Sequence, residues 1–203
     1  MSDILNRTDF TEKSHIALIT GGSGSGKSAF AENLVLKQPA ENRYYLATMQ
    51  VYGSEGRERV MRHRQLRHGK GFETLEYPTD VADCIGKIHQ PTAAVVLLEC
   101  MSNLVANEVF APEGRGADCS KVLKCGLHHL AGTAAHLVIV TNDIFSDGVT
   151  YDPETEQYRK ILGEVNREAA AMADYVYEVV CGIPICVKGE KRDFTDKNDK
   201  NNR

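Results

Sequence analysis

The stretch "ALITGGSGSGKSAF", Ala17–Phe30, contains the most informative pattern of this 203-residue chain. The apolar run from His15 to Thr20 predicts a buried β-strand, and the residues from Lys27 onward predict a helix. Between them stands the pattern Gly-x-x-x-x-Gly-Lys-Ser, which ends at Ser28. This pattern forms a phosphate-binding loop when a strand precedes it and a helix follows it. The stretch therefore predicts a nucleoside triphosphate site, and the alternative is a flexible glycine-rich turn.

The residue types of this loop suit the binding of a phosphate chain. Glycines let successive N–H groups turn inward around an anion, and the following helix adds the positive end of its dipole. We expect Lys27 to neutralise the charge of the β- and γ-phosphates and the Ser28 hydroxyl to hold Mg²⁺. The expected phosphate contacts are Gly21, Gly22, Ser23, Gly24, Ser25, Gly26, Lys27 and Ser28.

Further apolar runs alternate with helical patterns along the chain. Strands are predicted at His15–Thr20, Tyr44–Thr48, Phe72–Glu76, Ala93–Leu98 and His136–Thr141, and "YVYEVV" and "PICVK" predict a hairpin near the end. Helices are predicted at about Lys27–Lys37, Ser54–His68, Val81–His89, Asp118–Ala134 and Pro153–Ala173, the last with Asp152 as its N-cap. This alternation predicts a mostly parallel sheet with helices on both faces and one antiparallel edge strand.

Composition and charge narrow the class of protein. The formal net charge of -4 argues against a general nucleic-acid binder, and no apolar run approaches the length of a membrane span. The N-terminus lacks the apolar segment of a secretory signal, so we expect a cytoplasmic protein. Six cysteines without a Cys-x-x-Cys pair give no convincing zinc site. We expect one domain at 15–188, a flexible extension at 1–14 and a disordered tail at 189–203.

An acidic residue, Glu99, ends the predicted strand "VVLLEC". In open α/β sheets, ligands bind at the carboxyl ends of the strands. An acidic side chain at such a place in a P-loop protein lies near Mg²⁺ or the nucleotide. Glu99 is therefore a candidate site residue, and a solvated strand end is the alternative.

The second informative stretch is "SEGRERVMRHRQLRHGKG", Ser54–Gly71. Helical spacing places Arg59, His63 and Arg67 on one face. Positive neighbours favour a neutral imidazole, which is a competent nucleophile toward phosphorus, and guanidinium groups suit phosphate. The pattern fits a nucleophilic histidine in an anion site, but it also fits a solvated basic helix, and His68 is a competing histidine.

Together these motifs resemble the bifunctional adenosylcobinamide kinase/adenosylcobinamide-phosphate guanylyltransferase family of cobalamin biosynthesis. The resemblance covers roughly Ile16–Lys188 and rests on "LITGGSGSGKS", "YYLAT", "RVMRHRQLR", "LLECMSNLVAN", "VTND" and "GEVNREAAAMADYVYEVVCGIPICVK". It implies an α/β P-loop NTPase fold of the RecA-like type. It also implies that the chain phosphorylates adenosylcobinamide with ATP or GTP and then transfers GMP from GTP to the new phosphate.

The resemblance also implies site residues and partners. His63 matches the family histidine that carries GMP covalently. Outside the phosphate loop, the implied nucleotide contacts are Thr48, Met49, Gln50, Arg64, Gln65, Leu66, Arg67, Glu76 and Glu99. The implied partners are adenosylcobinamide, GTP and ATP, with Mg²⁺, and a homo-oligomer that is a trimer in the family. Two alternatives remain at this stage: a small-molecule kinase without the guanylyltransferase activity, and a nucleotide-dependent switch protein.

Overall fold

The computed structural model describes residues 15–50, 61 and 69–189. The expected N-terminal extension, nearly all of the predicted helix at 54–68 and most of the expected C-terminal tail lie outside these ranges. The described strands are β1 (His15–Thr20), β2 (Asn42–Ala47), β3 (Phe72–Glu76), β4 (Ala94–Glu99), β5 (His136–Val140), β6 (Tyr175–Val180) and β7 (Ile183–Lys188).

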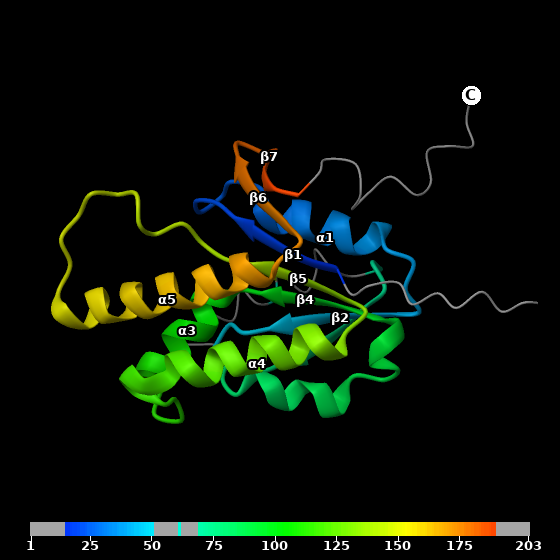
Figure 1. Cartoon of the computed structure of the whole chain (residues 1–203), viewed down its shortest axis with the longest axis horizontal. Coiled ribbons are helices and arrows are strands. Elements are labelled where there is room, and N and C mark those ends of the chain that lie inside the picture. The colour runs from blue at the N-terminus through cyan, green and yellow to red at the C-terminus, as the bar shows by residue number, and fades with distance from the viewer. Residues whose placement is uncertain (1–14, 51–60, 62–68, 190–203) are drawn as a thin grey trace, which may run out of the picture.

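Within the described residues, these strands form one sheet in the order β3-β2-β4-β5-β1-β6-β7 (Figure 1). All neighbouring pairs are parallel except β6 and β7, which form the antiparallel hairpin at the sheet edge. The predicted α/β P-loop fold, with its mostly parallel sheet and its antiparallel strand near the C-terminus, is therefore confirmed.

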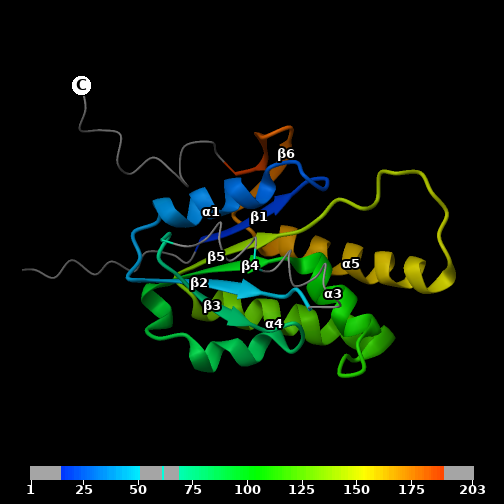
Figure 2. The same cartoon turned by 180° about the vertical axis from the view of Figure 1, so that it is seen from behind.

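Helices cover both faces of this sheet. The α-helices are α1 (Lys27–Lys37), α3 (Met101–Phe110), α4 (Cys119–Thr133) and α5 (Pro153–Met172), and the 3-10 helices are η1 (Val81–Lys87), η2 (Pro91–Ala93) and η3 (Gly116–Asp118). Figure 1 shows α1 on one face and α3, α4 and α5 on the other, and Figure 2 shows the same layers from behind. No helix in the described part of the chain has both the length and the apolar character that crossing a membrane would require.

Alternate side chains of each central strand fill two hydrophobic cores. On β1, Ala17 and Ile19 pack on the α1 side, whereas Leu18 packs on the side of α3, α4 and α5. All three side chains are buried. Because both faces of the strand are covered, its sequence is continuously apolar, as expected for a parallel sheet between helical layers.

Two predictions about helices were wrong. The segment predicted as an α-helix at Val81–His89 is a 3-10 helix that ends at Lys87, and Ile88 is extended. Gly86 weakens an α-helix there, and Gln90 takes a positive φ of 46° just before Pro91, so the chain turns early. The other error is that helix α3 was not predicted. Only Cys100 separates α3 from β4, and neither a glycine nor a side-chain cap marks the start of the helix.

Candidate active site

The phosphate loop connects the carboxyl end of β1 to α1 and depends on two glycines. Gly21 has φ +153°, and a Cβ atom there would lie 2.6 Å from the carbonyl oxygen of Val179. Gly26 has φ +91°, and a Cβ atom there would lie 3.2 Å from the Cα atom of Gly182. Side chains rarely fit such positions. The Gly182 N–H donates to the carbonyl oxygen of Ser25 at 2.8 Å, so the β6–β7 turn holds the loop in place.

The loop combines exposed backbone with one buried cation. Gly22, Ser23 and Gly24 are exposed, whereas Lys27 is buried at the first position of α1. The Lys27 ammonium donates to the carbonyl oxygen of Gly22 at 3.0 Å, which places its charge inside the curve of the loop. The first turn of α1 contains no acidic residue. The positive end of the helix and the ammonium therefore act together on the same space, as anion binding requires.

Ser28 and Glu99 meet beside this loop, although 71 residues separate them in the sequence. The Ser28 hydroxyl donates to Oε1 of Glu99 at 2.7 Å. Glu99 is the last residue of β4, and β5 separates β4 from β1 in the sheet. The carboxylate at the strand end and the hydroxyl of the phosphate loop thus form one oxygen-rich pair, which is the type of group that binds Mg²⁺.

The other described candidates follow β2 and β3. Glu76 pairs in register with Ala47, which pairs with Glu99, so the two carboxylates stand on the same edge with one strand between them. Thr48 is buried, and its hydroxyl is engaged by the backbone of Cys100: it accepts from the N–H and donates to the carbonyl, both at 2.8 Å. This hydroxyl therefore joins the end of β2 to the residue that follows β4.

Two more predicted contacts follow Thr48 directly. Met49 and Gln50 are half-buried, and the Gln50 side-chain amide donates to the carboxylate of Glu113. Gln50 is thus tied to the segment after α3, at the same end of the sheet as the phosphate loop. The remaining candidates, His63, Arg64, Gln65, Leu66 and Arg67, lie outside the described residues, as do Arg59, Arg62 and His68.

Sequence reasoning missed a polar network behind the loop. The Asn142 amide donates to the Ser102 hydroxyl at 2.6 Å, and Cys100 Sγ lies 3.0 Å from the same oxygen. Asn107 Nδ2 donates to the carbonyl oxygen of Thr48 at 2.7 Å, which joins α3 to the end of β2. The available signal was that Cys100, Ser102 and Asn142 all lie within four residues after the predicted strands Ala93–Leu98 and His136–Thr141.

Burial keeps two groups of this network protonated. Burial raises the pKa of the Cys100 thiol, despite its hydrogen bond to Ser102. Burial also raises the pKa of Tyr158 to about 12, and its hydroxyl donates to the carbonyl oxygen of Ser102 at 3.2 Å. A thiol with a raised pKa is a poor nucleophile at neutral pH. Cys100 and Tyr158 therefore support the site as neutral hydrogen-bonding groups.

The sequence of this chain is similar to those of known proteins. The chain is 31% identical over 182 residues to the bifunctional adenosylcobalamin biosynthesis protein CobU of Escherichia coli (strain K12), covering 84% of this chain and 98% of that protein. It is 27% identical over 175 residues to the bifunctional adenosylcobalamin biosynthesis protein CobP of Pseudomonas aeruginosa, covering 85% and 97%.

Among solved structures, the flagellar accessory protein FlaH of Methanocaldococcus jannaschii is similar, with a TM-score of 0.48, 13% identity and coverage of 87% of this chain and 79% of that one. The profile of a family described as cobinamide kinase / cobinamide phosphate guanyltransferase matches residues 17–187. That match spans β1 to β7 and includes the phosphate loop, Ser28 and Glu99. The chain therefore belongs to the cobinamide kinase / cobinamide phosphate guanyltransferase family.

Proposed function

We propose that this chain phosphorylates adenosylcobinamide with ATP or GTP and then transfers GMP from GTP to adenosylcobinamide phosphate. The observation that carries the first step is the meeting of Lys27, Ser28 and Glu99 at the phosphate loop. Lys27 and the loop N–H groups hold the triphosphate and stabilise the charge that develops on the transferred phosphoryl group. The acceptor hydroxyl attacks the γ-phosphorus while the bond to the β-phosphate oxygen breaks. Catalysis of this step is mostly positioning and electrostatics.

Mg²⁺ fits the residues at this place. The Ser28 hydroxyl and the Glu99 carboxylate offer two neighbouring oxygens, 2.7 Å apart, and Mg²⁺ is held in such sites by one or two oxygen ligands together with substrate phosphates. When bound, the ion neutralises charge on the phosphate oxygens. Ser28 and Glu99 would hold it, and Lys27 would act on the same phosphates from within the loop.

The second step needs a nucleophile, and we propose His63 for it. The imidazole attacks the α-phosphorus of GTP as the bond to pyrophosphate breaks. The phosphate of the acceptor then attacks the same phosphorus and breaks the P–N bond, which releases His63. Family membership supports this role. The connection that contains His63 also leaves β2 at the end where Ala47 pairs with Glu99, beside the candidate active site.

The test of the second step is covalent labelling with GTP that carries the label on its α-phosphate. We expect an acid-labile label on the unmodified protein, mapped to the peptide that contains His63. His63→Ala should lose this label and keep phosphorylation of adenosylcobinamide, whereas the matched variant His68→Ala should keep both. No label on the unmodified protein would instead favour a plain small-molecule kinase, and label that persists in His63→Ala would assign the nucleophile elsewhere.

Three further expectations belong to this proposal. They are a single domain at 15–188, a homotrimer and a cytoplasmic location. The domain expectation agrees with the family match over 17–187. The homotrimer rests on the family resemblance alone, and sedimentation velocity of the purified full chain would test it. The cytoplasmic location rests on the sequence features described above and stays a prediction.

A further inference from the structure

We propose that a pocket along α5 binds the amide-bearing ring of the cobinamide acceptor, an inference that rests on the proposed function. This α5 pocket has a volume of about 680 Å³. Its lining comes mainly from β1, from the segment between β5 and α5, and from one side of α5, and it includes Thr20, Thr141, Phe145, Arg159, Gly163 and Arg167. No role in nucleotide binding is expected for any of these residues, so the pocket is available for the second substrate.

The position of the α5 pocket suits an acceptor site. Thr20 directly precedes Gly21 of the phosphate loop, and Thr141 follows β5 on the neighbouring strand. The N–H of Asp143 donates to the carbonyl oxygen of Gly21 at 3.1 Å, so the segment that borders the pocket also touches the loop. In Figure 1 this segment arches from the end of β5 to the start of α5. One end of the pocket therefore reaches the strand edge at which the acceptor hydroxyl must meet the γ-phosphate.

One wall of the pocket is already fixed in place. Arg159 donates to Oε1 of Glu156 at 2.8 Å and to the carbonyl oxygen of Phe145 at 3.5 Å, and its guanidinium lies 5.1 Å from the ring centre of Tyr151. Its side chain is only 15% exposed. Further along α5, Asn166 Oδ1 accepts from the Thr141 hydroxyl at 2.9 Å, which fixes the amide. A wall with fixed side chains binds a rigid ligand at a lower entropic cost than mobile side chains do.

The pocket offers more hydrogen-bond donors than its own acceptors use. Glu156 is paired with Arg159, and Glu164 accepts from Ser120 at 2.8 Å. Among the described residues, the Lys160 ammonium, the Arg167 guanidinium and the Asn166 amino group make no hydrogen bond with a protein acceptor. These three groups, together with the buried Arg159 Nε, which makes no hydrogen bond within the described part of the chain either, are the surplus donors of the α5 pocket.

Cobinamide has the complementary chemistry. Its ring carries several neutral side-chain amides, whose carbonyl oxygens accept hydrogen bonds, around a large and largely apolar plane. The surplus donors would bind those oxygens, and Phe145, which is 41% exposed, offers an apolar surface to the plane. A nucleotide phosphate could also bind Lys160 or Arg167, so the experiment must separate the two ligands.

A larger side chain at Gly163 would occupy part of the α5 pocket. A Cβ atom at Gly163 would make ordinary contacts, 3.6 Å from Phe145 and 3.7 Å from Arg167, so a leucine there would extend into the pocket. We expect Gly163→Leu to weaken binding of adenosylcobinamide about tenfold or more in equilibrium dialysis, since a hydrophobic misfit of this size has that effect. Binding of GTP should be unchanged. Gly132→Leu makes the same change on α4, in open space, and should bind both ligands normally.

A second variant tests the donors directly. Arg167→Ala should weaken adenosylcobinamide binding about tenfold, because it removes charged donors from amide carbonyls, and should leave GTP binding unchanged. Lys121→Ala removes a similar exposed cation from α4 and is the matched control. Arg167→Ala decides the question if circular dichroism shows that Gly163→Leu is unfolded.

The outcomes separate this inference from the proposed function. If the unmodified chain neither binds adenosylcobinamide nor phosphorylates it, the proposed function fails and this inference fails with it. If the unmodified chain does both, and the two pocket variants bind adenosylcobinamide as tightly as their controls, only the assignment of the pocket is overturned. A folded variant that loses GTP binding assigns the pocket to the nucleotide and also overturns it.

Discussion

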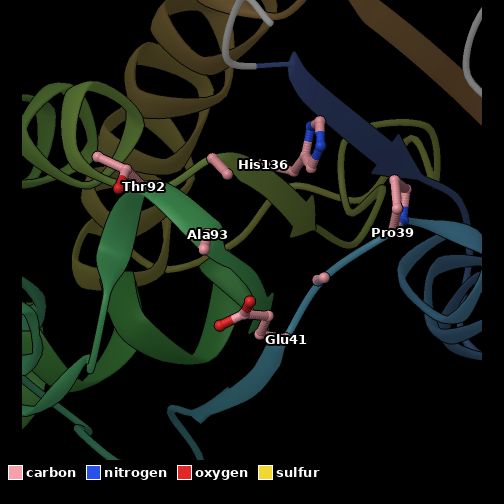
Figure 3. A pocket seen from close by; sticks show the side chains of 7 residues that line it. Pro39, Glu41, Thr92, Ala93 and His136 are labelled. Carbon is pink, nitrogen blue, oxygen red and sulfur yellow. The ribbon is translucent and has the colours of Figure 1, made fainter. Parts of the chain in front are cut away.

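The two ends of the parallel sheet differ in the side chains that they bring together. At the amino end, a cavity of about 540 Å³ lies between the segment after α1, η2 and the start of β5. Figure 3 shows its labelled side chains, Pro39, Glu41, Thr92, Ala93 and His136. The His136 ring is buried and stacks on the ring of His15, with 5.5 Å between ring centres. This lining is mostly small or apolar, and its carboxylate is exposed.

At the carboxyl end, polar side chains from distant parts of the chain converge and bind one another. Lys27 reaches into the phosphate loop, Ser28 binds Glu99, and Thr48 joins β2 to the residue after β4. The volume of a cavity alone therefore does not identify the site. In a parallel sheet, the carboxyl ends of the strands face the positive ends of the following helices, so anionic ligands bind there.

The strongest test of this comparison removes one charge from each end. Lys27→Ala should reduce phosphorylation of adenosylcobinamide about 10²–10³-fold, because it removes a positioned cation from the developing phosphate charge. Glu41→Gln changes a charged residue of the amino-end cavity and should leave the rate unchanged. Steady-state assays of both variants measure the effect. Equal losses in the two variants would contradict the assignment of the site to the carboxyl end.

The next effect concerns the oxygen pair. Glu99→Gln keeps the shape of the side chain but removes its charge, so it should weaken Mg²⁺ binding and lower the rate about 10–100-fold. Titration of the kinase rate with Mg²⁺ should show a higher concentration at half-maximal activity. The comparison variant is Glu76→Gln, because Glu76 lies at the end of β3 on the same edge of the sheet. A normal Mg²⁺ requirement in Glu99→Gln would show that Glu99 does not hold the ion.

The sequence predicted the phosphate loop and most of the sheet because their signals are local. The glycine pattern fixes Gly21 to Ser28 within eight positions, and the bounds of β1, β3 and α1 agree with those predicted. Predicting Glu99 near the Mg²⁺ or the nucleotide needed one further step, namely that ligands of open α/β sheets bind at the carboxyl ends of the strands. The hydrogen bond between Ser28 and Glu99 could not be predicted, since strand order in the sheet decides it.

The unpredicted parts depend on contacts between distant segments. The polar network of Asn142, Ser102 and Cys100 forms only when β4 and β5 lie side by side. The α5 pocket likewise requires β1 to lie beneath α5, although 132 residues separate Thr20 from Asp152. Polar residues often follow strands, so the sequence alone does not show which of these side chains contact one another in the folded protein.

A smaller effect, on the free energy of unfolding, is expected to differ between two glycines of the phosphate loop. Gly21→Ala should destabilise the protein by about 1–3 kcal/mol, because its Cβ atom would lie 2.6 Å from the carbonyl oxygen of Val179 in a strained backbone conformation. Gly22→Ala is the matched control, since a Cβ atom at Gly22 has no neighbour within 4 Å. Urea unfolding of both variants tests this difference. Equal stability of the two would mean that the β6–β7 turn does not constrain the loop.

The smallest effect is expected at Asp152, a polar residue near the carboxyl end of the sheet that stabilises α5 but has no expected role in the transfer reactions. Asp152 caps α5: its carboxylate accepts from the N–H groups of Glu154 and Thr155, both at 3.0 Å, and from the Thr155 hydroxyl at 2.6 Å. These hydrogen bonds, first the one from the Thr155 side chain, lower the pKa of Asp152 below its ordinary value of 3.8. The stabilisation is therefore present above pH 3.8 and is lost as the pH falls through the lower pKa of the folded state.

Asp152→Ala should lower the melting temperature by roughly 2–4 °C at pH 7 and leave the transfer reactions unchanged. Asp152→Asn should keep the cap and most of the stability at pH 7. Because asparagine does not titrate, the stability of this variant should lack the decrease that protonation of Asp152 causes below pH 3.8. Thermal unfolding from pH 7 to pH 3 measures both variants. If Asp152→Asn is as unstable as Asp152→Ala at pH 7, the charge rather than the cap stabilises α5. A loss of kinase activity in either variant would instead place the start of α5 in the acceptor site.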